Sequence, residues 1–368
     1  MSRSPTVFFA FRDAPERRAA LRTPAALDRY RLFGLDEIAR HAVVRHNLER
    51  DGAPPAWARA AERAFNGMLD AAGGLGGDFA SILASRRDAN AADVVFSTVE
   101  TVGIPVLMLK HVGLIRPPLV YTSVGLPERL ARLRNDRMRR FFRDALRSAQ
   151  TIVTYAASEA ARLGDWIGAD APPVVFVPFG VDVVTFRPQP DREPTVDVVS
   201  VGADPWRDFG LLTEVASRRP ELSFRIVAGR DHARTLTSVP ANVTVETDLR
   251  LEEVRDRLAV ARVVALPVRE NSYSGATTVL LQAMAMAKPV VVSRTEAIAS
   301  GYGLEDGVNC CLVEPGDADA LELALVETLT GADAAVSLGI RARETVERGF
   351  SWGRYTNALW EILAAAAA

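Results

Sequence analysis

The 368-residue sequence has few lysines, cysteines and histidines and no long apolar run, and each shortage excludes a class of protein. Only Lys110 and Lys288 are lysines among 44 cationic residues, and 46 acidic residues leave a net charge of −2, which argues against a nucleic-acid binder. The two cysteines, Cys310 and Cys311, are adjacent, so we expect no disulfide between them. Four scattered histidines and no CxxC pair predict neither a metal site nor a cofactor.

Length and composition predict a folded protein of two domains. At roughly 150 residues per domain, 368 residues suggest two, and 48% hydrophobic with 24% charged residues is typical of globular chains. No apolar stretch reaches the about 18 residues of a membrane span. A short apolar run at the N-terminus passes directly into charged residues, unlike a signal peptide, so we expect a cytoplasmic protein.

Apolar β-branched runs alternate with helical patterns throughout the chain. Such runs are typical of parallel strands covered on both faces, which indicates an α/β, doubly wound, Rossmann-like architecture in each half. We predict strands at 6–11, 43–47, 93–98, 118–123, 151–156 and 174–180 in the first half, and at 197–202, 223–229, 242–247, 262–268, 289–293 and 309–314 in the second. Helices are expected between most of them, for example at 207–218, 252–260 and 276–287.

Two further segments bear on how the predicted elements are divided into domains. Residues 127–149 are rich in arginine and have apolar residues at helical spacing, which predicts one amphipathic helix whose charges are more simply explained by solvent than by an anionic partner. The proline-bearing stretch 186–194 reads as a hinge. We therefore expect domains at 1–185 and 186–350, facing each other across a cleft, and a final helix at 351–368 that crosses back to the first.

The strongest local constellation is the segment 269–293, where a polar turn separates a strand from a helix. A glycine at this helix start lets a ligand approach the backbone, and the unpaired N–H groups and helix dipole favour an anion such as a diphosphate. The alternative is that the turn only caps the helix. The residues expected to contact the ligand are Gly275, Ala276, Thr277, Thr278 and Gln282.

Several motifs in order resemble those of the family 4-like retaining glycosyltransferases, which have the GT-B fold. VPFGVDVVTFRP (177–188) is similar to that family's interdomain signature, and SGATTVLLQAMAMAKPVVVS (274–293) to its donor-site segment. VGADPWRDFGLLTEVA (201–216), GVNCCLVEPGDADALELAL (307–325) and LGIRARETVERGFSW (338–352) continue the match, which covers about 170–365. The N-terminal half matches in pattern only.

The resemblance implies transfer of a sugar from a nucleotide-diphospho-sugar to a hydroxyl or amine of a small-molecule or glycan acceptor, with retained configuration. It implies no metal, no protein base and a front-face mechanism. The resemblance does not decide whether the donor nucleotide is UDP, GDP, ADP or dTDP. It also does not decide whether the protein is a homodimer. The composition suggests a bacterial natural-product or envelope sugar.

Departures from the family pattern fall at the expected donor site. The resemblance aligns Ser274 and Gln282 with two family glutamates, Ala203 with a family arginine and Arg207 with a phosphate-binding lysine. Gln282 can still hydrogen-bond a ribose, and Arg207 offers a fork to a phosphate. Glu270 either takes the role of the family glutamate that is missing at Ser274 or is an exposed loop residue. Arg230, which follows a strand, either reaches the nucleotide or lies on the surface.

The acceptor side is less defined. The family's strand-end histidine aligns near Ser123, so it is absent here unless His111 takes its place. The loop GGLGGDFASIL (73–83) includes Gly76 and Gly77, and Asp78 is placed to cap the next helix. It is either a flexible acceptor-side loop or a plain turn between helices.

Two rival functions remain beside the transferase. One is another GT-B enzyme, an epimerase or phosphorylase. The other is a catalytically weak protein that binds a sugar nucleotide or partners an active transferase, which the losses at Ser274, Ala203 and Val124 suggest. A dehydrogenase is disfavoured, because neither half has GxGxxG after its first strand.

Overall fold

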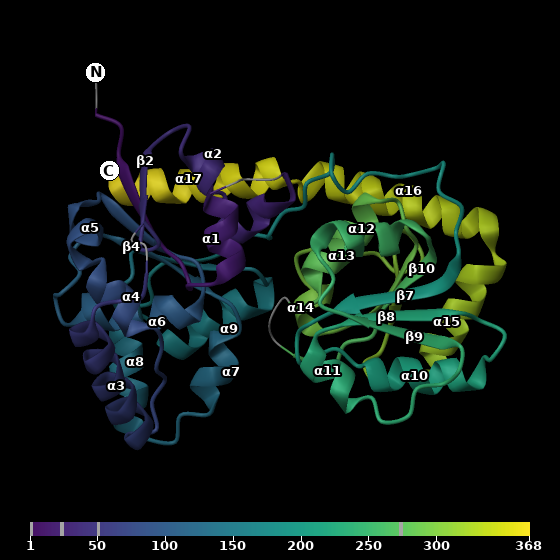
Figure 1. Cartoon of the computed structure of the whole chain (residues 1–368), viewed down its shortest axis with the longest axis horizontal. Coiled ribbons are helices and arrows are strands. Elements are labelled where there is room, and N and C mark those ends of the chain that lie inside the picture. The colour runs from purple at the N-terminus through teal and green to yellow at the C-terminus, as the bar shows by residue number, and fades with distance from the viewer. Residues whose placement is uncertain (1–2, 23–25, 50–51, 272–274) are drawn as a thin grey trace. The chain divides into compact units, whose positions relative to one another are not determined.

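The structure is a computed structural model that describes residues 3–22, 26–49, 52–271 and 275–368. The chain forms two compact units (Figure 1). Unit 1 comprises residues up to Val177 together with Thr356–Ala368, and unit 2 comprises Pro178–Tyr355. The chain therefore passes between the units at 177–178 and at 355–356, and the stretch 186–194 lies within unit 2.

Unit 1 is built on a six-stranded parallel sheet in the order β2-β1-β3-β4-β5-β6. Its strands are β1 (Thr6–Ala10), β2 (Val43–His46), β3 (Val94–Ser97), β4 (Leu119–Ser123), β5 (Thr151–Thr154) and β6 (Val174–Phe176). Its helices are α1 (Pro15–Arg22), a 3-10 helix (Ala26–Leu32), α2 (Leu35–Ile38), α3 (Ala56–Ala71), α4 (Phe79–Ala84), α5 (Arg86–Ala91), α6 (Glu100–His111), α7 (Leu126–Ala131), α8 (Asp136–Arg147) and α9 (Ala157–Ile167).

Unit 2 has a second six-stranded parallel sheet, in the order β12-β11-β10-β7-β8-β9. Its strands are β7 (Val196–Gly202), β8 (Phe224–Ala228), β9 (Val243–Thr247), β10 (Ala261–Leu266), β11 (Val290–Ser293) and β12 (Cys311–Val313). Its helices are α10 (Phe209–Arg218), α11 (Arg230–Thr235), α12 (Leu251–Ala259), α13 (Thr277–Ala285), α14 (Glu296–Ala299), α15 (Ala318–Thr330), α16 (Ala332–Gly349) and the start of α17 (Trp352–Ala367).

The structure confirms the doubly wound α/β prediction, and all twelve predicted strands are present within a few residues. The central strands of both sheets are almost fully buried, which is why they read as continuous apolar runs. In unit 2, α12 and α13 lie on one side of the strands and α10 and α11 on the other (Figure 1). Cys310 and Cys311 are both free thiols, as expected.

The single helix predicted over 127–149 is wrong, because the segment folds as two helices, α7 and α8. Asn135 ends the break between them: its side-chain oxygen accepts a hydrogen bond from the backbone N–H of Arg137 at 2.9 Å and caps α8. Leu133, inside the break, is buried against the core of unit 1. An N-cap asparagine competes with helix continuation, and the apolar spacing alone did not reveal it.

The residues of the signature 177–188 hold the start of unit 2 against α17. The backbone N–H of Val181 donates to the carbonyl of Phe350 at 2.9 Å, and that of Trp352 donates to Val181 at 2.7 Å. A Cβ on Gly180 would lie 2.5 Å from the carbonyl oxygen of Ser351, so only glycine permits this close approach.

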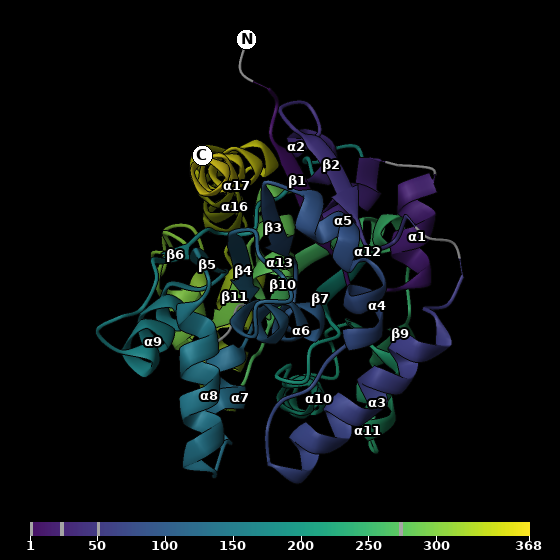
Figure 2. The same cartoon turned by 90° about the vertical axis from the view of Figure 1, so that its left-hand side faces the viewer.

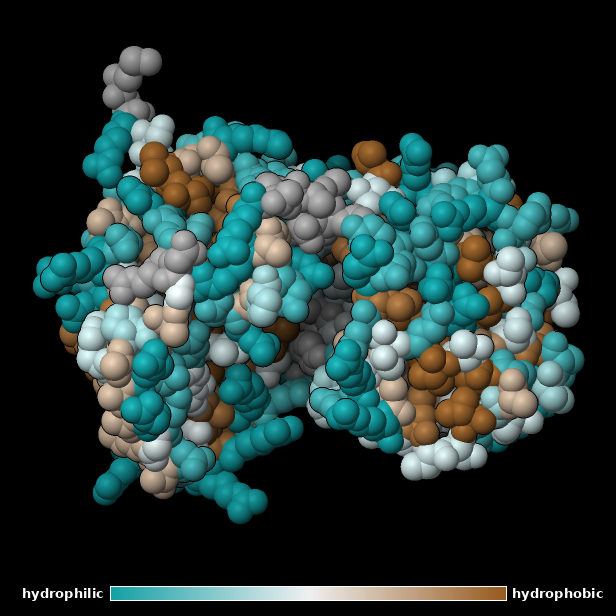
Figure 3. Space-filling model, in the orientation of Figure 1, coloured by the Kyte–Doolittle hydropathy of each residue, from teal (hydrophilic) through white to brown (hydrophobic). Residues whose placement is uncertain are grey.

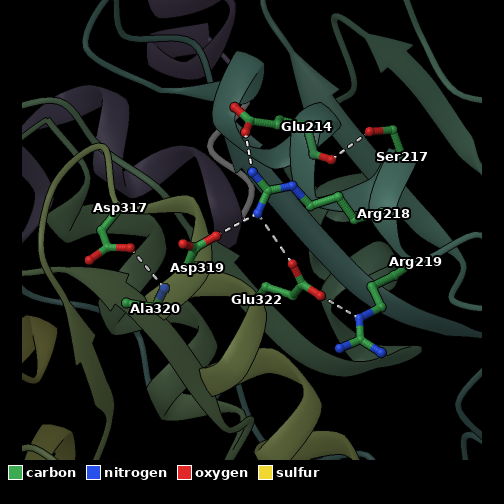
Figure 4. Close-up of polar contacts among 8 residues, drawn as sticks. All are labelled: Glu214, Ser217, Arg218, Arg219, Asp317, Asp319, Ala320 and Glu322. Carbon is green, nitrogen blue, oxygen red and sulfur yellow. Dashed lines mark hydrogen bonds and ion pairs between the residues drawn. The ribbon is translucent and has the colours of Figure 1, made fainter.

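An arginine network joins α10 to α15 on the surface of unit 2 (Figure 4). The guanidinium of Arg218 lies 2.7 Å from Asp319 and 3.4 Å from Glu322, which both belong to α15. Arg219 reaches the same Glu322 at 2.6 Å. Because the arginines are partly exposed, water screens these pairs and each contributes little to stability.

We expect Gly339→Ala to destabilise the protein by about 1–3 kcal/mol, although alanine is normally the better helix residue. Gly339 lies inside α16, and a Cβ there would come within 2.1 Å of the carbonyl oxygen of Ala287. Thermal unfolding measures the effect. The matched control is Gly164→Ala in α9, where nothing lies within 4 Å of the added methyl group. Equal effects of the two changes would contradict the close packing of α16.

Candidate functional site

The topology of unit 2 places its candidate site at the carboxyl ends of β7 and β10. These two strands are neighbours at the centre of the sheet, and the order of the strands reverses between them. In open α/β sheets, the loops that leave two such strands diverge to opposite faces and open a crevice for a ligand. The loop that follows β7 contains Arg207, and the loop that follows β10 leads to α13.

Arg207 is buried at the carboxyl end of β7, with only 2% of its surface exposed. Its side chain lies over Gly202, where an added Cβ would come within 2.0 Å of Nε. Nε is 2.9 Å from Oδ2 of Asp204 in the same loop. A buried guanidinium is an expensive group to keep, and the carboxylate of Asp204 provides a partner of opposite charge for it.

Backbone contacts fasten the Arg207 loop to the segment that leads into α13. Arg207 forms an antiparallel bridge with Val268. The N–H of Asp208 donates to the carbonyl of Pro267 at 2.9 Å, and the N–H of Arg269 donates to that of Trp206 at 2.8 Å. The structure thus joins the loop after β7 to the segment directly after β10, more than 60 residues further along the sequence.

Helix α13 begins at Thr277, directly after Gly275 and Ala276. Ala276 already has helical dihedral angles, and its own side chain makes no cap hydrogen bond. Thr277 is buried and Thr278 is half-buried. Gln282, further along the helix, is 3% exposed. Ser274 lies outside the described residues.

Glu270 and Arg230 lie near this edge, in different settings. Oε1 of Glu270 accepts hydrogen bonds from the N–H of Asn271 at 3.2 Å and from the N–H of Glu296, in the first turn of α14, at 3.1 Å. The carboxylate is therefore engaged with α14. Arg230 is the first residue of α11, largely exposed, and pairs with Asp248. It stays a surface-accessible candidate for nucleotide contact.

In unit 1, two glutamates hold the turn after β4. Oε1 of Glu159 accepts hydrogen bonds from the hydroxyl of Ser123 and from the N–H of Gly125, both at 2.6 Å. Glu100, in the first turn of α6, accepts from the N–H of Val124. Both glutamates are buried, and they follow β3 and β5, the two neighbours of β4. Ser123 therefore belongs to a buried carboxylate cluster.

Burial and mutual repulsion keep this pair of carboxylates partly protonated near neutral pH. Burial raises the pKa of Glu100 to about 8, and the nearby Glu159 carboxylate adds to the rise. Burial likewise raises the pKa of Glu159 to about 7, against the opposing effect of its hydrogen bonds from Ser123 and Gly125. A protonated carboxyl can donate a hydrogen bond, which a carboxylate cannot.

We expect the protein to lose stability as the pH rises through about 7 to 8. Both pKa values lie above the 4.5 of an ordinary glutamate, so the folded chain retains protons that the unfolded chain releases. The stabilisation is complete below about pH 4.5 and is lost as the pH passes the folded values. Thermal unfolding between pH 6 and pH 9 measures it.

Glu159→Gln should flatten this dependence, because the amide cannot ionise and its oxygen still accepts from Ser123 and Gly125. The control is Glu361→Gln, at an exposed position on α17. An unchanged pH dependence in Glu159→Gln would contradict the shared-proton interpretation.

The glycine loop is a packed turn between α3 and α4. The side chain of Asn66 bonds both the N–H and the carbonyl of Gly77, at 3.0 and 2.9 Å. A Cβ on Gly76 would lie 2.2 Å from Asn66 Oδ1. Asp78 caps α4 through the N–H of Ser81 at 2.9 Å, which confirms that part of the prediction. These contacts favour the turn between helices over the flexible loop.

The same turn lies beside α6, since the N–H of Asp78 donates to the carbonyl of Thr101 at 2.8 Å. Gly77 and Asp78 are therefore near the Glu100 end of α6. His111 is the last residue of that helix and packs against Phe141. Eleven residues of rise, about 16 Å, separate it from Glu100, so the structure does not bring His111 to the turn of Ser123.

Sequence reasoning missed the roles of Glu100 and Glu159. Each is an acidic residue that comes just after a buried strand, at the start of the following helix. That placement is a usable signal, because the carboxyl ends of parallel strands meet at one edge.

Within the described residues, no group of three or more histidine, cysteine, aspartate or glutamate side chains could hold a metal ion. No single helix in the described chain is long and apolar enough to cross a membrane.

Comparisons with known proteins find similarity to one family in part of the C-terminal half. Residues 209–331 match the family described as Glycosyl transferases group 1. The chain is 28% identical over 251 residues to a D-inositol 3-phosphate glycosyltransferase of Kineococcus radiotolerans, an alignment covering 58% of this chain and 57% of that protein. It is 30% identical over 186 residues to an MMP alpha-(1->4)-mannosyltransferase of Mycolicibacterium hassiacum, covering 48% and 44%. The chain thus spans about half the length of these curated relatives.

Solved structures share the fold over nearly the whole chain. Sucrose-phosphate synthase from Thermosynechococcus elongatus superposes with a TM-score of 0.72 at 16% identity, covering 98% of this chain and all of that one. The Anabaena protein HepE in complex with UDP and glucose superposes with a TM-score of 0.73 at 16% identity and the same coverage. At such identities the likeness shows the fold, which is that of the GT-B glycosyltransferases.

Proposed function

We propose that this chain, whose residues 209–331 match the glycosyl transferases group 1, moves a sugar from a nucleotide-diphospho-sugar to a hydroxyl or amine of an acceptor. The observation that carries this proposal is the buried Arg207. It lies at the end of β7, at the point where the strand order reverses, and is fastened to the segment that leads into α13. A fixed cation at a strand end suits a diphosphate.

In this proposal, unit 2 stabilises the leaving nucleoside diphosphate. Negative charge develops on the phosphate as the bond to the sugar breaks. The Arg207 guanidinium, the first N–H groups of α13 and the hydroxyls of Thr277 and Thr278 would receive it without reorganising. Gln282 would hydrogen-bond the ribose. Charge stabilisation comes from the protein itself, so the proposed reaction needs no metal.

The stereochemistry proposed is retention by a front-face reaction. The departing phosphate takes the proton of the acceptor hydroxyl, so no protein side chain acts as general base. The acceptor would be held by the carboxyl edge of unit 1, where Ser123 and the Glu100–Glu159 pair lie. Experiment has to identify the sugar, the nucleotide and the acceptor. UDP-glucose is the first donor to try, because HepE has been solved in complex with it.

The test is release of nucleoside diphosphate from UDP-, GDP-, ADP- and dTDP-sugars, with and without a panel of alcohol and amine acceptors. We expect one donor to be cleaved faster when an acceptor is present, and the product to keep its anomeric configuration. Tight nucleotide binding without release from any donor would favour the second candidate, a catalytically weak protein that binds sugar nucleotides. Ala203, which aligns with a family arginine, is the observation that supports this alternative.

A further inference from the structure

The segment after β1 in unit 1 lies at a second point where the order of the strands reverses. In the sheet of unit 1, β2 lies on one side of β1 and β3 lies on the other. Loops that leave two such strands diverge and open a crevice at their carboxyl ends. In Figure 2, α1 lies to the right of β1 and β2, whereas β3 to β6 lie to their left. Residues 11–18 therefore flank the crevice of unit 1.

Hydrogen bonds fix the end of β1 to both of its neighbours in the sheet. The side chain of Asn47, just after β2, accepts from the N–H of Phe11 at 2.7 Å and donates to its carbonyl at 2.8 Å. On the other side, the N–H and the hydroxyl of Thr98, just after β3, donate to the carbonyl of Ala10 at 3.2 and 3.0 Å. Phe11 is fully buried. These contacts give the following side chains a fixed base.

Arg17, in the first turn of α1, is held over this base by groups that carry no negative charge. Its Nε donates to the carbonyl of Arg31 at 2.8 Å, and its Nη1 donates to the carbonyl of Arg12. The guanidinium carbon lies 5.4 Å from the centre of the Phe11 ring and 5.5 Å from that of Phe33. Among the residues described, no carboxylate lies within ion-pair distance of Arg17, and its Nη2 has no hydrogen-bond partner. The side chain is half-buried and fixed, with Nη2 left for a ligand.

A carboxylate close to Arg17 is already engaged by another arginine. The two oxygens of Asp13 accept from Nε and Nη2 of Arg18, at 2.7 and 2.9 Å. Burial lowers the pKa of Arg17 to about 10, and repulsion from Arg12 and Arg31 adds to the fall. The nearby carboxylates oppose these effects without cancelling them. A half-buried guanidinium that faces like charges is costly, and an anion at Nη2 would offset that cost.

We propose that the acceptor carries a negatively charged group, a phosphate or a carboxylate, which binds Arg17 with Arg12 beside it. This inference rests on the proposed transferase function and names the class of its acceptor. Arginine pairs with both kinds of group through its fork of N–H donors. Figure 3 shows mostly hydrophilic side chains over α1, which suits a charged ligand.

The spacing of the strands sets the size of such an acceptor. The carboxyl ends of β1 and β4 lie two strands apart in the sheet, which is about 10 Å. A sugar ring with one anionic substituent spans a distance of this order. Anchored at Arg17 by its charge, it would reach the turn of Ser123 with its other end.

Calorimetric titration of the full chain with glucose, glucose 6-phosphate and glucuronate tests the proposal, because these probes share a sugar ring and differ in charge. We expect at least one anionic probe to bind about tenfold more tightly than glucose, on the scale of a hydrogen bond to a charged group. The tighter of the two identifies phosphate or carboxylate. Added salt should weaken the preference.

Two variants should reduce the preference for the anionic probe. Arg17→Gln should remove it, once the variant is shown to keep its thermal midpoint. Arg12→Gln changes an exposed residue and should lower it a few-fold, so it decides the question if Arg17→Gln does not fold. Both should bind nucleoside diphosphate like the unmodified chain, because that site is proposed in unit 2.

Arg143→Gln is the matched control. Nε of Arg143 donates to the carbonyl of Trp166 at 3.2 Å and its guanidinium carbon lies 5.2 Å from that ring, so the packing resembles that of Arg17. It lies on α8, toward the end that leads into β5, and so away from the carboxyl ends of the strands. This variant should keep the preference for the anionic probe.

The proposal is overturned if neither anionic probe binds more tightly than glucose, or if the preference survives in both Arg17→Gln and Arg12→Gln. It is also overturned if Arg143→Gln loses the preference as fully, or if Arg17→Gln weakens nucleoside diphosphate binding as much as it weakens binding of the probe. None of these measurements needs turnover. They are therefore distinct from a failure of the proposed function, which is the absence of nucleoside diphosphate release from every donor.

Discussion

Arg207→Ala is expected to lower turnover by two to three orders of magnitude, the usual loss when one fixed donor to a developing anion is removed. The guanidinium is buried at the carboxyl end of β7 and its neighbour Asp204 keeps it in place. In the variant, water would fill the space and would have to reorient as negative charge develops on the departing phosphate. The arginine is already in place and does not have to reorient. The measurement is the steady-state rate of nucleoside diphosphate release with the best donor.

Two variants separate this chemical effect from a loss of folding. Arg207→Lys retains the positive charge and should recover part of the rate of nucleoside diphosphate release. Arg250→Ala removes an exposed arginine more than 40 residues further along the sequence and should leave that rate unchanged. Thermal midpoints of all three report on stability. A folded Arg207→Ala protein with a rate within a few-fold of the unmodified chain would remove Arg207 from the site.

Gln282→Ala is expected to weaken nucleoside diphosphate binding about tenfold, on the scale of a lost hydrogen-bonding side chain in a buried position. If Gln282 contacts the ribose, the unmodified protein should prefer ribonucleotides to their 2′-deoxy counterparts, and the variant should lose that preference. Calorimetric titration with both nucleotides measures it. Gln282→Glu, which introduces the family residue, should keep the preference. Equal affinities in all proteins would show that α13 is aligned incorrectly with the donor-site segment.

The strands could be predicted from the sequence because of their environment. A parallel strand covered on both faces has to be apolar at every position, as in Val263–Leu266 of β10, so it is visible without any tertiary information. The helix after β4 was different. Its apolar spacing runs through 127–149, but the Asn135 cap divides it, and a capping asparagine cannot be told from an exposed one by periodicity.

The donor side of the candidate site could be predicted from the sequence, because each of its parts lies within a short motif. Arg207 and the start of α13 each lie in a short motif, and the structure adds the backbone contacts between their two loops. The Glu100–Glu159 pair could not be found in that way. Its members are nearly 60 residues apart, and only the adjacency of β3, β4 and β5 brings them to the same turn. Isolated acidic residues in a sequence are usually exposed.

The central claim, that unit 2 binds a nucleoside diphosphate between Arg207 and the start of α13, is tested most directly by calorimetry. The full chain is titrated with UDP, GDP, ADP and dTDP, beside Arg207→Ala. We predict one-to-one binding of at least one diphosphate, several-fold weaker binding of the matching monophosphate, and a marked loss of affinity in the variant. Binding of none of the four, or equal binding by the Arg207→Ala protein, would contradict the claim.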